Sequence, residues 1–412
     1  LFAASAAKWA ALWAEHDVVI DSKNDFDQLL VRFALYHLNV MGKKDDNRMG
    51  IGAKGLTGEG YKGHSFWDTE IFILPYFILT QPEAAKKLVE YRYKGLYGAR
   101  LKAKENGYEG AMFPWEAAWV DDGEVTPLWG GADVVTGEPI KILTGIIEQH
   151  ITADVVFGVW QYYMVTGDQD FMDRCGYELI IDTARFWASR CQWDEKKQAY
   201  VILDVIGPDE YKEHVDNNAY TNYMGKRTLA YAAQVLADMQ CKQPAAYAAL
   251  AEKTALAPDE PACWQHIADN MYLPQDETGL IEQHDGYFDL PHTDINAIPM
   301  SEFPLYNHWS YDRIYRSDMI KQPDVLMFLY LYNSSFTREV KRINYEFYEP
   351  RTIHESSLSP AIHSILAAEL DKMDEAVRFF GYATRLDLDN YNRNTREGLH
   401  LSLIHISEPT RQ

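Results

Sequence analysis

Apolar residues recur every three to four positions over most of the chain, the spacing that places them on one face of a helix. Between residues 25 and 40, Phe26, Leu29, Leu30 and Phe33 follow this spacing. Loops rich in Gly, Pro, Asp and Asn separate the apolar segments, and proline or glycine ends several of them. The pattern predicts helices over 25–40, 66–79, 82–106, 148–165, 168–191, 220–239, 245–255, 261–271, 323–332, 336–347, 358–370 and 371–386.

Successive helices joined by long loops predict an all-α architecture. Two segments lack the helical spacing. Residues 200–206 form an apolar run that ends at Gly207 and Pro208, because proline has no donor for a strand ladder and fixes its own backbone angle. Residues 280–288 mix charged and aromatic positions. We interpret both segments as excursions of loops between helices.

The composition is that of a folded protein with an acidic surface. The 412 residues are 47% apolar and allow one large domain or two to three smaller ones. The charge, 39 basic minus 61 acidic residues, is −22. Such a surface repels the phosphates of nucleic acids and of anionic lipids, and no apolar run approaches the roughly 20 residues that cross a bilayer. We therefore expect neither nucleic acid nor a membrane as a partner.

The four cysteines, Cys175, Cys191, Cys241 and Cys263, show neither a CxxC spacing nor histidines at the intervals of a zinc site. We interpret them as buried reduced thiols, which favours a cytoplasmic location, and we expect no metal. The chain opens on Leu1 rather than on methionine, which leaves a lost signal peptide or a lost upstream domain open.

Residues 50–55 match the GxGxxG pattern of dinucleotide-binding loops. Such a loop requires a preceding strand, a following helix and an acidic residue about 20 positions on. Here the polar residues 43–48 precede the pattern, and more glycine follows it. A flexible glycine-rich loop is therefore the better interpretation.

Tryptophan beside a carboxylate occurs twice in the chain. Trp67 and Asp68 begin an apolar helix, so they are either a core tryptophan next to an N-capping carboxylate or a sugar platform whose carboxylate accepts hydroxyl donors. Trp115 and Glu116 repeat the combination on a loop. The 11 Trp and 27 Tyr of the chain fit a sugar-binding protein, although most aromatic residues belong to cores.

Residues 206–222 concentrate carboxylates, amides and aromatic side chains. Glu210 follows Gly-Pro-Asp, a common first turn of a helix, where acidic residues are favoured. Asp209 and Glu213 are close in sequence, and repulsion between carboxylates raises the pKa of one of them, as a general acid requires. If the segment is helical, Glu210 and Glu213 share a face. A helix start and a catalytic acid both fit this segment.

Polar side chains also precede two of the later predicted helices. Lys321 and Gln322 stand before one of them. His354 and a group of serines stand before the other, namely Ser356, Ser357 and Ser359. Free backbone amides and the helix dipole favour an anion at such a position, but the serines fit plain N-capping equally well.

Four segments, in this order along the chain, resemble glycoside hydrolase family 65, the family of maltose, kojibiose, nigerose and trehalose phosphorylases. They are GLTGEGYKGHSFWDTE (55–70), GPDEYKEHVDNN (207–218), MIKQPDV (319–325) and HESSLSP (354–360). The resemblance implies an (α/α)6 barrel, a toroid of helical hairpins, over residues 1–400, incomplete at the C-terminus. It also implies that the family's N-terminal β-sandwich and C-terminal β-domain are absent. We interpret residues 401–412 as a non-native tail that resembles translated adapter sequence.

The resemblance further implies the roles of single residues. Glu210 matches the general acid of the family. The pairs that match its glucose-binding positions are Trp67 with Asp68 and Lys321 with Gln322, and Trp115 is a further candidate for substrate binding. The residues that fall in its phosphate loop are His354, Ser356 and Ser357. No cofactor is implied, inorganic phosphate is a co-substrate, and the frequent homodimers of the family leave a homodimer open.

An inverting glycosidase needs an acid and a base that activates water, whereas a phosphorylase needs only the acid, because phosphate is itself the nucleophile. The reaction implied is inverting phosphorolysis of an α-linked glucosyl disaccharide, which releases β-glucose 1-phosphate and a free sugar. Two alternatives stay open: an α-glucoside hydrolase in which Glu355 activates water, and a non-catalytic carbohydrate-binding protein or inactive fragment. The linkage is not fixed, and candidate acceptor loops are 115–116, 216–218 and 306–309.

Overall fold

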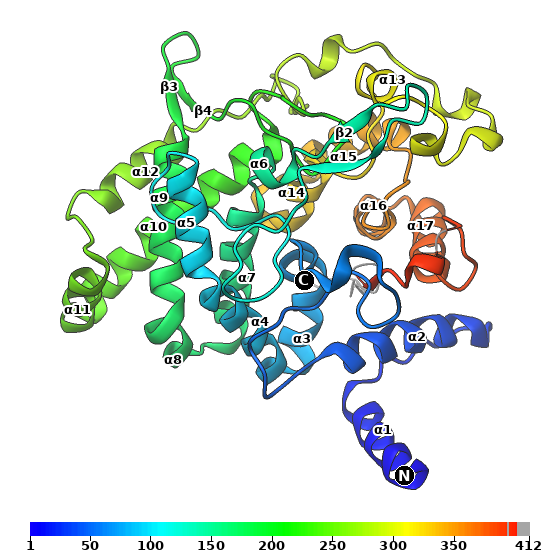
Figure 1. Cartoon of the computed structure of the whole chain (residues 1–412), viewed down its shortest axis with the longest axis horizontal. Helices are drawn as coiled ribbons and strands as arrows, with labels where there is room; N and C mark the ends of the chain where they lie inside the picture. Colours follow the sequence, from blue (N-terminus) through cyan, green and yellow to red (C-terminus); the bar gives the residue numbers. More distant parts are fainter. Residues whose placement is uncertain (394, 402–412) are drawn as a thin grey trace.

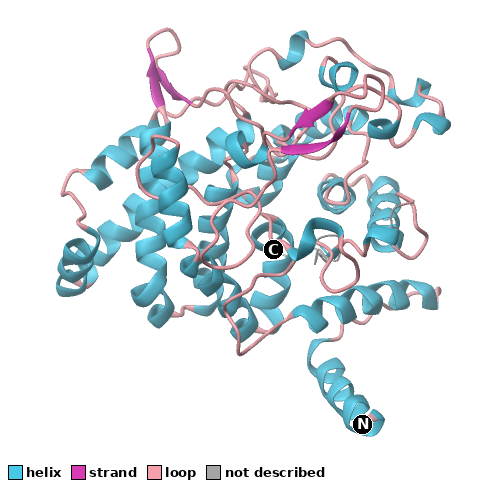
Figure 2. Cartoon of the chain, in the orientation of Figure 1, coloured by secondary structure: helices cyan, strands magenta, loops and turns pink. Residues whose placement is uncertain are grey.

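The computed structural model describes residues 1–393 and 395–401, and helices dominate it (Figure 1, Figure 2). The all-α prediction is confirmed. The helices are α1 (Phe2–His16), α2 (Asp25–Met41), α3 (Leu74–Thr80), α4 (Pro82–Lys94), α5 (Leu96–Glu105), α6 (Thr144–Ile147), α7 (Ile151–Thr166), α8 (Gln169–Phe171), α9 (Tyr177–Arg190), α10 (Ala219–Lys242), α11 (Pro244–Thr254), α12 (Glu260–Asp269), α13 (Tyr311–Tyr315), α14 (Val325–Leu331), α15 (Arg338–Tyr348), α16 (Ser359–Glu369) and α17 (Met373–Arg385).

The helices form two layers, as expected of an (α/α)6 barrel. In the described residues the inner layer follows the order α3, α7, α10, α14 and α16, each helix packed on the next. Outer helices lie against them: α4 on α3, α9 and α12 on α10, α15 on α14, and α17 on α16. Helices α7, α14 and α16 are buried on nearly every side, as apolar helices in the centre of a protein are. Helix α2 packs on α17 and so joins distant parts of the chain (Figure 1).

Side-chain caps and prolines set the start of many helices. Asn24, Asn218 and Thr337 accept a backbone N–H at the first turn of α2, α10 and α15. Proline occupies the first or second position of α4, α11 and α16, where its missing donor leaves no bond unmade. Gly167 ends α7 in the left-handed conformation, with φ 63°.

Three predicted helices differ in detail from the observed ones. The predicted helix 82–106 is divided at Gly95 into α4 and α5. The predicted helices 66–79 and 168–191 each contain a π-helical turn, Thr69–Ile73 before α3 and Met172–Gly176 before α9. The apolar pattern continues through a π turn, so periodicity does not reveal one.

Two short antiparallel hairpins are the strands of the described chain. They are β1 (Trp129–Ala132) with β2 (Pro139–Lys141) and β3 (Gln192–Asp194) with β4 (Ala199–Val201). The segment 200–206, interpreted as a loop excursion, therefore begins in a strand, and Val205 adds a single bridge to Val215. Helices α1, α6 and α13 were not predicted. Helix α1 has no buried residue, although Trp13 packs against the main core, and α6 and α13 are only four and five residues long.

The main core lies between the two helix layers. A second, smaller core lies in residues 291–317, here called the lobe (yellow in Figure 1), and in segments packed against them. The lobe contributes Leu305, Trp309 and Ile314 to this core, and three residues contribute from outside it, namely Tyr211, Met319 and Ile353. The lobe is therefore anchored on the segments that carry three of the four sequence motifs.

Two of the four cysteine predictions are wrong. Cys241 at the end of α10 and Cys263 on α12 are exposed, whereas Cys175 is buried and Cys191 is partly buried. The error arises because an apolar residue type does not reveal which face of an outer helix it occupies. No helix among residues 1–393 and 395–401 is long and apolar enough to cross a bilayer. The predicted tail 401–412 lies outside the described residues, except for its first residue.

Candidate functional site

Segments that precede the inner helices meet in a cavity of about 120 Å³, here called the central cavity. Eight of the nine site residues predicted from sequence line it: Trp67, Asp68, Trp115, Glu210, Lys321, Gln322, Ser356 and Ser357. The ninth, His354, does not. Six further residues complete the lining, namely Ala53, Lys54, Tyr61, Phe66, Leu358 and His400. The roles assigned to these residues stay predictions, but their convergence on one cavity is a property of the fold.

Glu210 and Lys321 form an ion pair at the cavity. Lys321 Nζ donates to Glu210 Oε1 at 3.1 Å, and about a third of the Glu210 side chain is exposed. Burial is the largest single effect and lowers the pKa of Lys321, but Glu210, Tyr61 and Glu148 together outweigh burial, so the net pKa is raised. Lys321 therefore stays cationic at neutral pH beside a carboxylate that solvent or a ligand can reach.

Asp209 holds the loop of Glu210 against the loop of Lys321. Its buried carboxylate accepts the Lys321 backbone N–H at 2.8 Å and Gln283 Nε2 at 2.9 Å. Gln322 adds a second link, since its Nε2 donates to the Pro208 carbonyl at 2.6 Å. The loop 207–218 that carries Glu210, here called the acid loop, is thus fixed by neighbours that are distant in sequence.

The backbone of this loop approaches its neighbours too closely for a side chain at position 207. A Cβ on Gly207 would lie 2.2 Å from Asn218 Nδ2 and 2.5 Å from Asp324 Oδ2. We expect Gly207→Ala to lower the free energy of unfolding by about 1–3 kcal/mol, because the loop must shift. Gly381→Ala in α17 is the matched control, because its Cβ meets nothing within 4 Å. Urea unfolding measures both, and equal stabilities of the two variants would contradict the close packing.

Glu213 was the competing candidate for the acid, on the assumption that the segment is helical. No helix covers residues 207–218, so Glu210 and Glu213 share no helical face. Glu213 is absent from the lining of the central cavity, and burial raises its pKa. The geometry therefore separates the two glutamates and leaves Glu210 at the cavity.

Beneath the tryptophans lies a buried charged network that sequence reasoning missed. The His150 ring meets Trp67 and Trp115 edge to face, with centroids 4.9 and 5.4 Å apart. Its Nδ1 bonds Asp154 at 2.7 Å and its Nε2 bonds Glu148 at 3.3 Å. Burial lowers the pKa of His150, but the two carboxylates outweigh burial and raise it to about 9. A cationic imidazole thus supports the aromatic wall.

This network makes stability depend on pH. The pKa of His150 in the folded protein lies above the usual 6.5, so its protonated form stabilises the fold fully below pH 6.5, and this contribution is lost as pH rises through about 9. Burial also raises the pKa of Glu148, which acts with the same sign. We expect the free energy of unfolding to fall between pH 6.5 and 9, and His150→Gln to flatten that slope. Urea unfolding at the two pH values tests this, and identical slopes would refute it.

The Trp67 and Asp68 pair does not behave as a helix cap. Asp68 makes no capping hydrogen bond at the turn that follows it, and Trp67 is 2% exposed while it still lines the cavity. Trp67 is therefore both a core residue and a wall of the cavity. The two interpretations offered by the sequence are not exclusive for this tryptophan.

The segment 354–358, here called the serine loop, is hydrogen-bonded to Gln322. Ser356 Oγ donates to Gln322 Oε1, and the Leu358 backbone N–H donates to Ser356 Oγ at 3.2 Å. Gln322 thereby bridges the acid loop and the serine loop. Ser357 lines the cavity together with Ser356 and Glu210.

Two basic side chains of the cavity, Lys54 and His400, were missed by sequence reasoning. Lys54 is buried, and its Nζ lies 3.4 Å from the Gly398 carbonyl. His400 is held by Asp387, whose carboxylate bonds the ring Nδ1 at 2.7 Å and accepts the backbone N–H at 2.8 Å. Together with Lys321, these groups make the cavity suitable for an anion. Among the described residues no group of three or more His, Cys, Asp or Glu side chains is arranged to hold a metal.

Comparison with known proteins decides the family. Residues 32–406 match the family model described as the Glycosyl hydrolase family 65 central catalytic domain. The chain belongs to glycoside hydrolase family 65. It is 50% identical to kojibiose phosphorylase of Halothermothrix orenii, over 97% of this chain and 51% of that protein. It is 41% identical to α,α-trehalose phosphorylase of Thermoanaerobacter brockii, over 95% of this chain and 48% of that protein.

A solved structure assigned provisionally as a kojibiose phosphorylase from the human microbiome has the same fold. Its TM-score is 0.87 at 39% identity, and the match covers 97% of this chain and 56% of that one. The family 65 chain thus spans about half the length of the curated relatives it matches. The (α/α)6 barrel expected from sequence agrees with this match.

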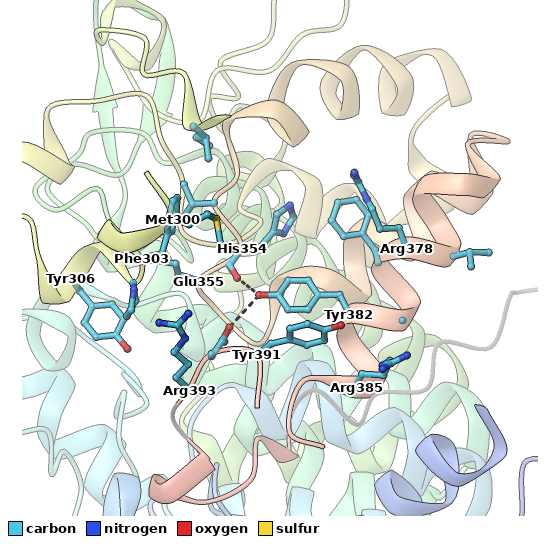
Figure 3. A pocket seen from close by; sticks show the side chains of 17 residues that line it. Met300, Phe303, Tyr306, His354, Glu355, Arg378, Tyr382, Arg385, Tyr391 and Arg393 are labelled. Carbon is cyan, nitrogen blue, oxygen red and sulfur yellow. Dashed lines mark hydrogen bonds between the residues drawn. The ribbon is translucent and has the colours of Figure 1, made fainter. Parts of the chain in front are cut away.

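His354 lies on the other side of the serine loop in this family 65 chain. It lines a second cavity of about 660 Å³, here called the outer cavity, between the lobe and α17 (Figure 3). His354 Nδ1 bonds Ser359 Oγ at 2.8 Å, and burial lowers the pKa of His354 to about 3. Its imidazole is therefore neutral at physiological pH. Its predicted contact with phosphate stays a prediction, and the fold does not bring it to the central cavity.

The glycine-rich segment near Lys54 packs against the end of the described chain. A Cβ on Gly58 would lie 2.3 Å from the Glu397 carbonyl oxygen, and Gly398 approaches Gly58 in turn. No strand precedes the segment. Its glycines therefore serve close backbone packing beside the central cavity, and the features of a dinucleotide loop are missing from this described region.

Proposed function

We propose that the chain catalyses inverting phosphorolysis of an α-linked glucosyl disaccharide, releasing β-glucose 1-phosphate and a free sugar. The observation that carries the proposal is the composition of the central cavity. Glu210 lies there beside Lys321, and the hydroxyls of Ser356 and Ser357 lie there with His400. A carboxyl group that supplies a proton, next to cationic and hydroxyl groups that suit a phosphate, is the minimum a phosphorylase needs.

In the proposed reaction Glu210 protonates the glycosidic oxygen while phosphate attacks C1 from the opposite face. The C1–O bond to the leaving sugar breaks, a C1–O bond to phosphate forms, and the proton of Glu210 leaves with the sugar. Ser356, Ser357 and His400 would orient the phosphate, and Lys321 would balance the negative charge. Trp67 with Asp68 and Lys321 with Gln322 would hold the glucosyl ring, Trp67 by its face and Asp68 by accepting hydroxyl donors.

The hydrolase alternative is less well supported, because its base is already engaged. Glu355 was the candidate for activating water, yet both of its carboxylate oxygens accept a hydrogen bond from the protein and it lines the outer cavity rather than the central one. The names of the relatives also favour phosphorylases, among them kojibiose, trehalose and maltose phosphorylases. We further propose a cytoplasmic location and a reaction without metal or organic cofactor, with a homodimer left open.

A screen of kojibiose, nigerose, maltose and trehalose, each with and without inorganic phosphate, tests the function. Release of glucose 1-phosphate only in the presence of phosphate, with one of the four sugars preferred, is the expected result. Release of free glucose at the same rate without phosphate would overturn the proposal in favour of hydrolysis. Binding of sugar without turnover under any condition would favour the non-catalytic alternative.

A further inference from the structure

Glu355 occupies a junction that the proposed reaction does not use. Its Oε2 accepts the Tyr211 hydroxyl at 2.7 Å, and its Oε1 accepts the Leu305 backbone N–H at 2.5 Å. Each oxygen therefore has one donor, and the two donors come from segments far apart in the chain. Burial raises the pKa of Glu355, while both donors oppose burial by stabilising the charged form.

The three residues of this junction each adjoin a different part of the site. Tyr211 directly follows Glu210, the proposed acid. Glu355 directly precedes Ser356 in the serine loop, which is the proposed phosphate-binding segment. Leu305 is fully buried in the small core of the lobe, where Trp309 packs with it.

The lobe has contacts within itself and one backbone hydrogen bond to this junction. Arg313 lies over the Trp309 ring at 3.3 Å from its centroid, and Trp309 Nε1 donates to Glu302 at 2.5 Å. These contacts hold the lobe together internally. The hydrogen bond between Leu305 and Glu355 connects the lobe to the serine loop. Glu355 lines the outer cavity together with Phe303 and Tyr382, as Figure 3 shows.

We propose that Glu355 is a positioning residue that connects the acid loop, the serine loop and the lobe. It thereby fixes the distance between Glu210 and the bound phosphate. This proposal rests on the proposed function for its kinetic part. A base for water would need a free oxygen at the central cavity, whereas the Glu355 oxygens are engaged elsewhere. In-line attack is sensitive to such placement, since a shift of about 1 Å can cost about 100-fold in rate.

Three variants separate the two bonds of Glu355. Tyr211→Phe removes only the bond to Oε2. Glu355→Ala removes both bonds. Glu355→Gln keeps one acceptor oxygen but turns an amide donor toward a second donor, so it loses one of the two bonds. Glu349→Gln is the matched control, because this partly buried glutamate, six residues earlier in the chain, pairs with Arg378 at 3.4 Å and lies outside the junction.

We expect Glu355→Ala to lower kcat by about 10- to 100-fold, with the KM for disaccharide within about 3-fold of the wild type. The kcat values of Tyr211→Phe and Glu355→Gln should lie between those of the wild type and Glu355→Ala. Hydrogen exchange of the Leu305 amide reports the second bond directly. It should accelerate in Glu355→Ala and stay unchanged in Tyr211→Phe and in Glu349→Gln. Thermal unfolding shows whether a rate loss merely follows a loss of folded protein.

Two results would overturn the proposal. One is an unchanged exchange rate of the Leu305 amide in Glu355→Ala, which would show that the bond holds nothing in solution. The other is wild-type kcat in Glu355→Ala. If the wild type releases free glucose without phosphate and Glu355→Ala abolishes only that release, Glu355 is a base and the proposed function fails as well. The exchange measurement needs no turnover, so it decides the junction even where the proposed function is wrong.

Discussion

Replacing Glu210 by Gln is expected to lower kcat for the preferred disaccharide by about 10²- to 10⁴-fold while sugar binding is retained. Gln has nearly the same shape as Glu, and its carbonyl oxygen can still accept the bond from Lys321 Nζ, which lies 3.1 Å from Glu210 Oε1. What the variant lacks is a proton for the leaving sugar. The loss should therefore appear in kcat rather than in the affinity for glucose measured by calorimetry.

A substrate that needs no acid sharpens this prediction. α-Glucosyl fluoride has a leaving group that departs with little protonation, so Glu210→Gln should retain a much larger share of the wild-type rate with it than with a disaccharide. Glu213→Gln is the matched control, since Glu213 lies three residues on and does not line the cavity. Equal losses with both substrates, or equal losses in both variants, would mean that Glu210 is not the acid.

Lys321→Ala is expected to lower kcat/KM for phosphate by about 10²- to 10³-fold, or about 2.7–4 kcal/mol, as the loss of a preorganised charged donor does. Lys321 is held cationic by Glu210, which raises its pKa despite the opposing effect of burial. Its removal takes away the positive charge that pairs with Glu210 at the central cavity. Affinity for the sugar should change less than the dependence on phosphate.

The control for this variant is Lys242→Ala, an exposed lysine at the end of α10 that pairs with Asp238. Its removal should leave kcat/KM within about 2-fold, because exposed ion pairs contribute little. Steady-state rates at varied phosphate and fixed disaccharide measure both variants. A Lys321→Ala enzyme that saturates with phosphate like the wild type would contradict a role for this charge at the anion.

Much of the fold follows from the periodicity of apolar residues. The limits of α2, α10, α16 and α17 lie within a few residues of the predictions, because polar residues or a proline mark the start of these helices in the sequence. Periodicity did not reveal the break at Gly95 or the two π turns, since apolar positions continue through them. It also missed α1, which buries no residue.

The site residues could be predicted where reactive side chains stand close together in the sequence, and not where they stand singly. Glu210 stands in a carboxylate-rich loop, and four motifs in family order indicated its neighbours. Lys54, His150 and His400 stand alone in the sequence, and only the fold carries them to the cavity or to the wall behind it. His354 shows the converse error. It is close to Ser356 in sequence, yet it lies on the opposite side of the serine loop and lines the outer cavity.

The most direct test of the proposed reaction is the anomeric configuration of the first glucose 1-phosphate formed, followed by proton NMR during the initial phase of turnover. Protonation by Glu210 and attack by phosphate from the opposite face of an α-glucoside predict β-glucose 1-phosphate, one molecule for each disaccharide cleaved and each phosphate consumed. Formation of the α anomer, or of free glucose without consumption of phosphate, would contradict a single acid acting with phosphate as the nucleophile.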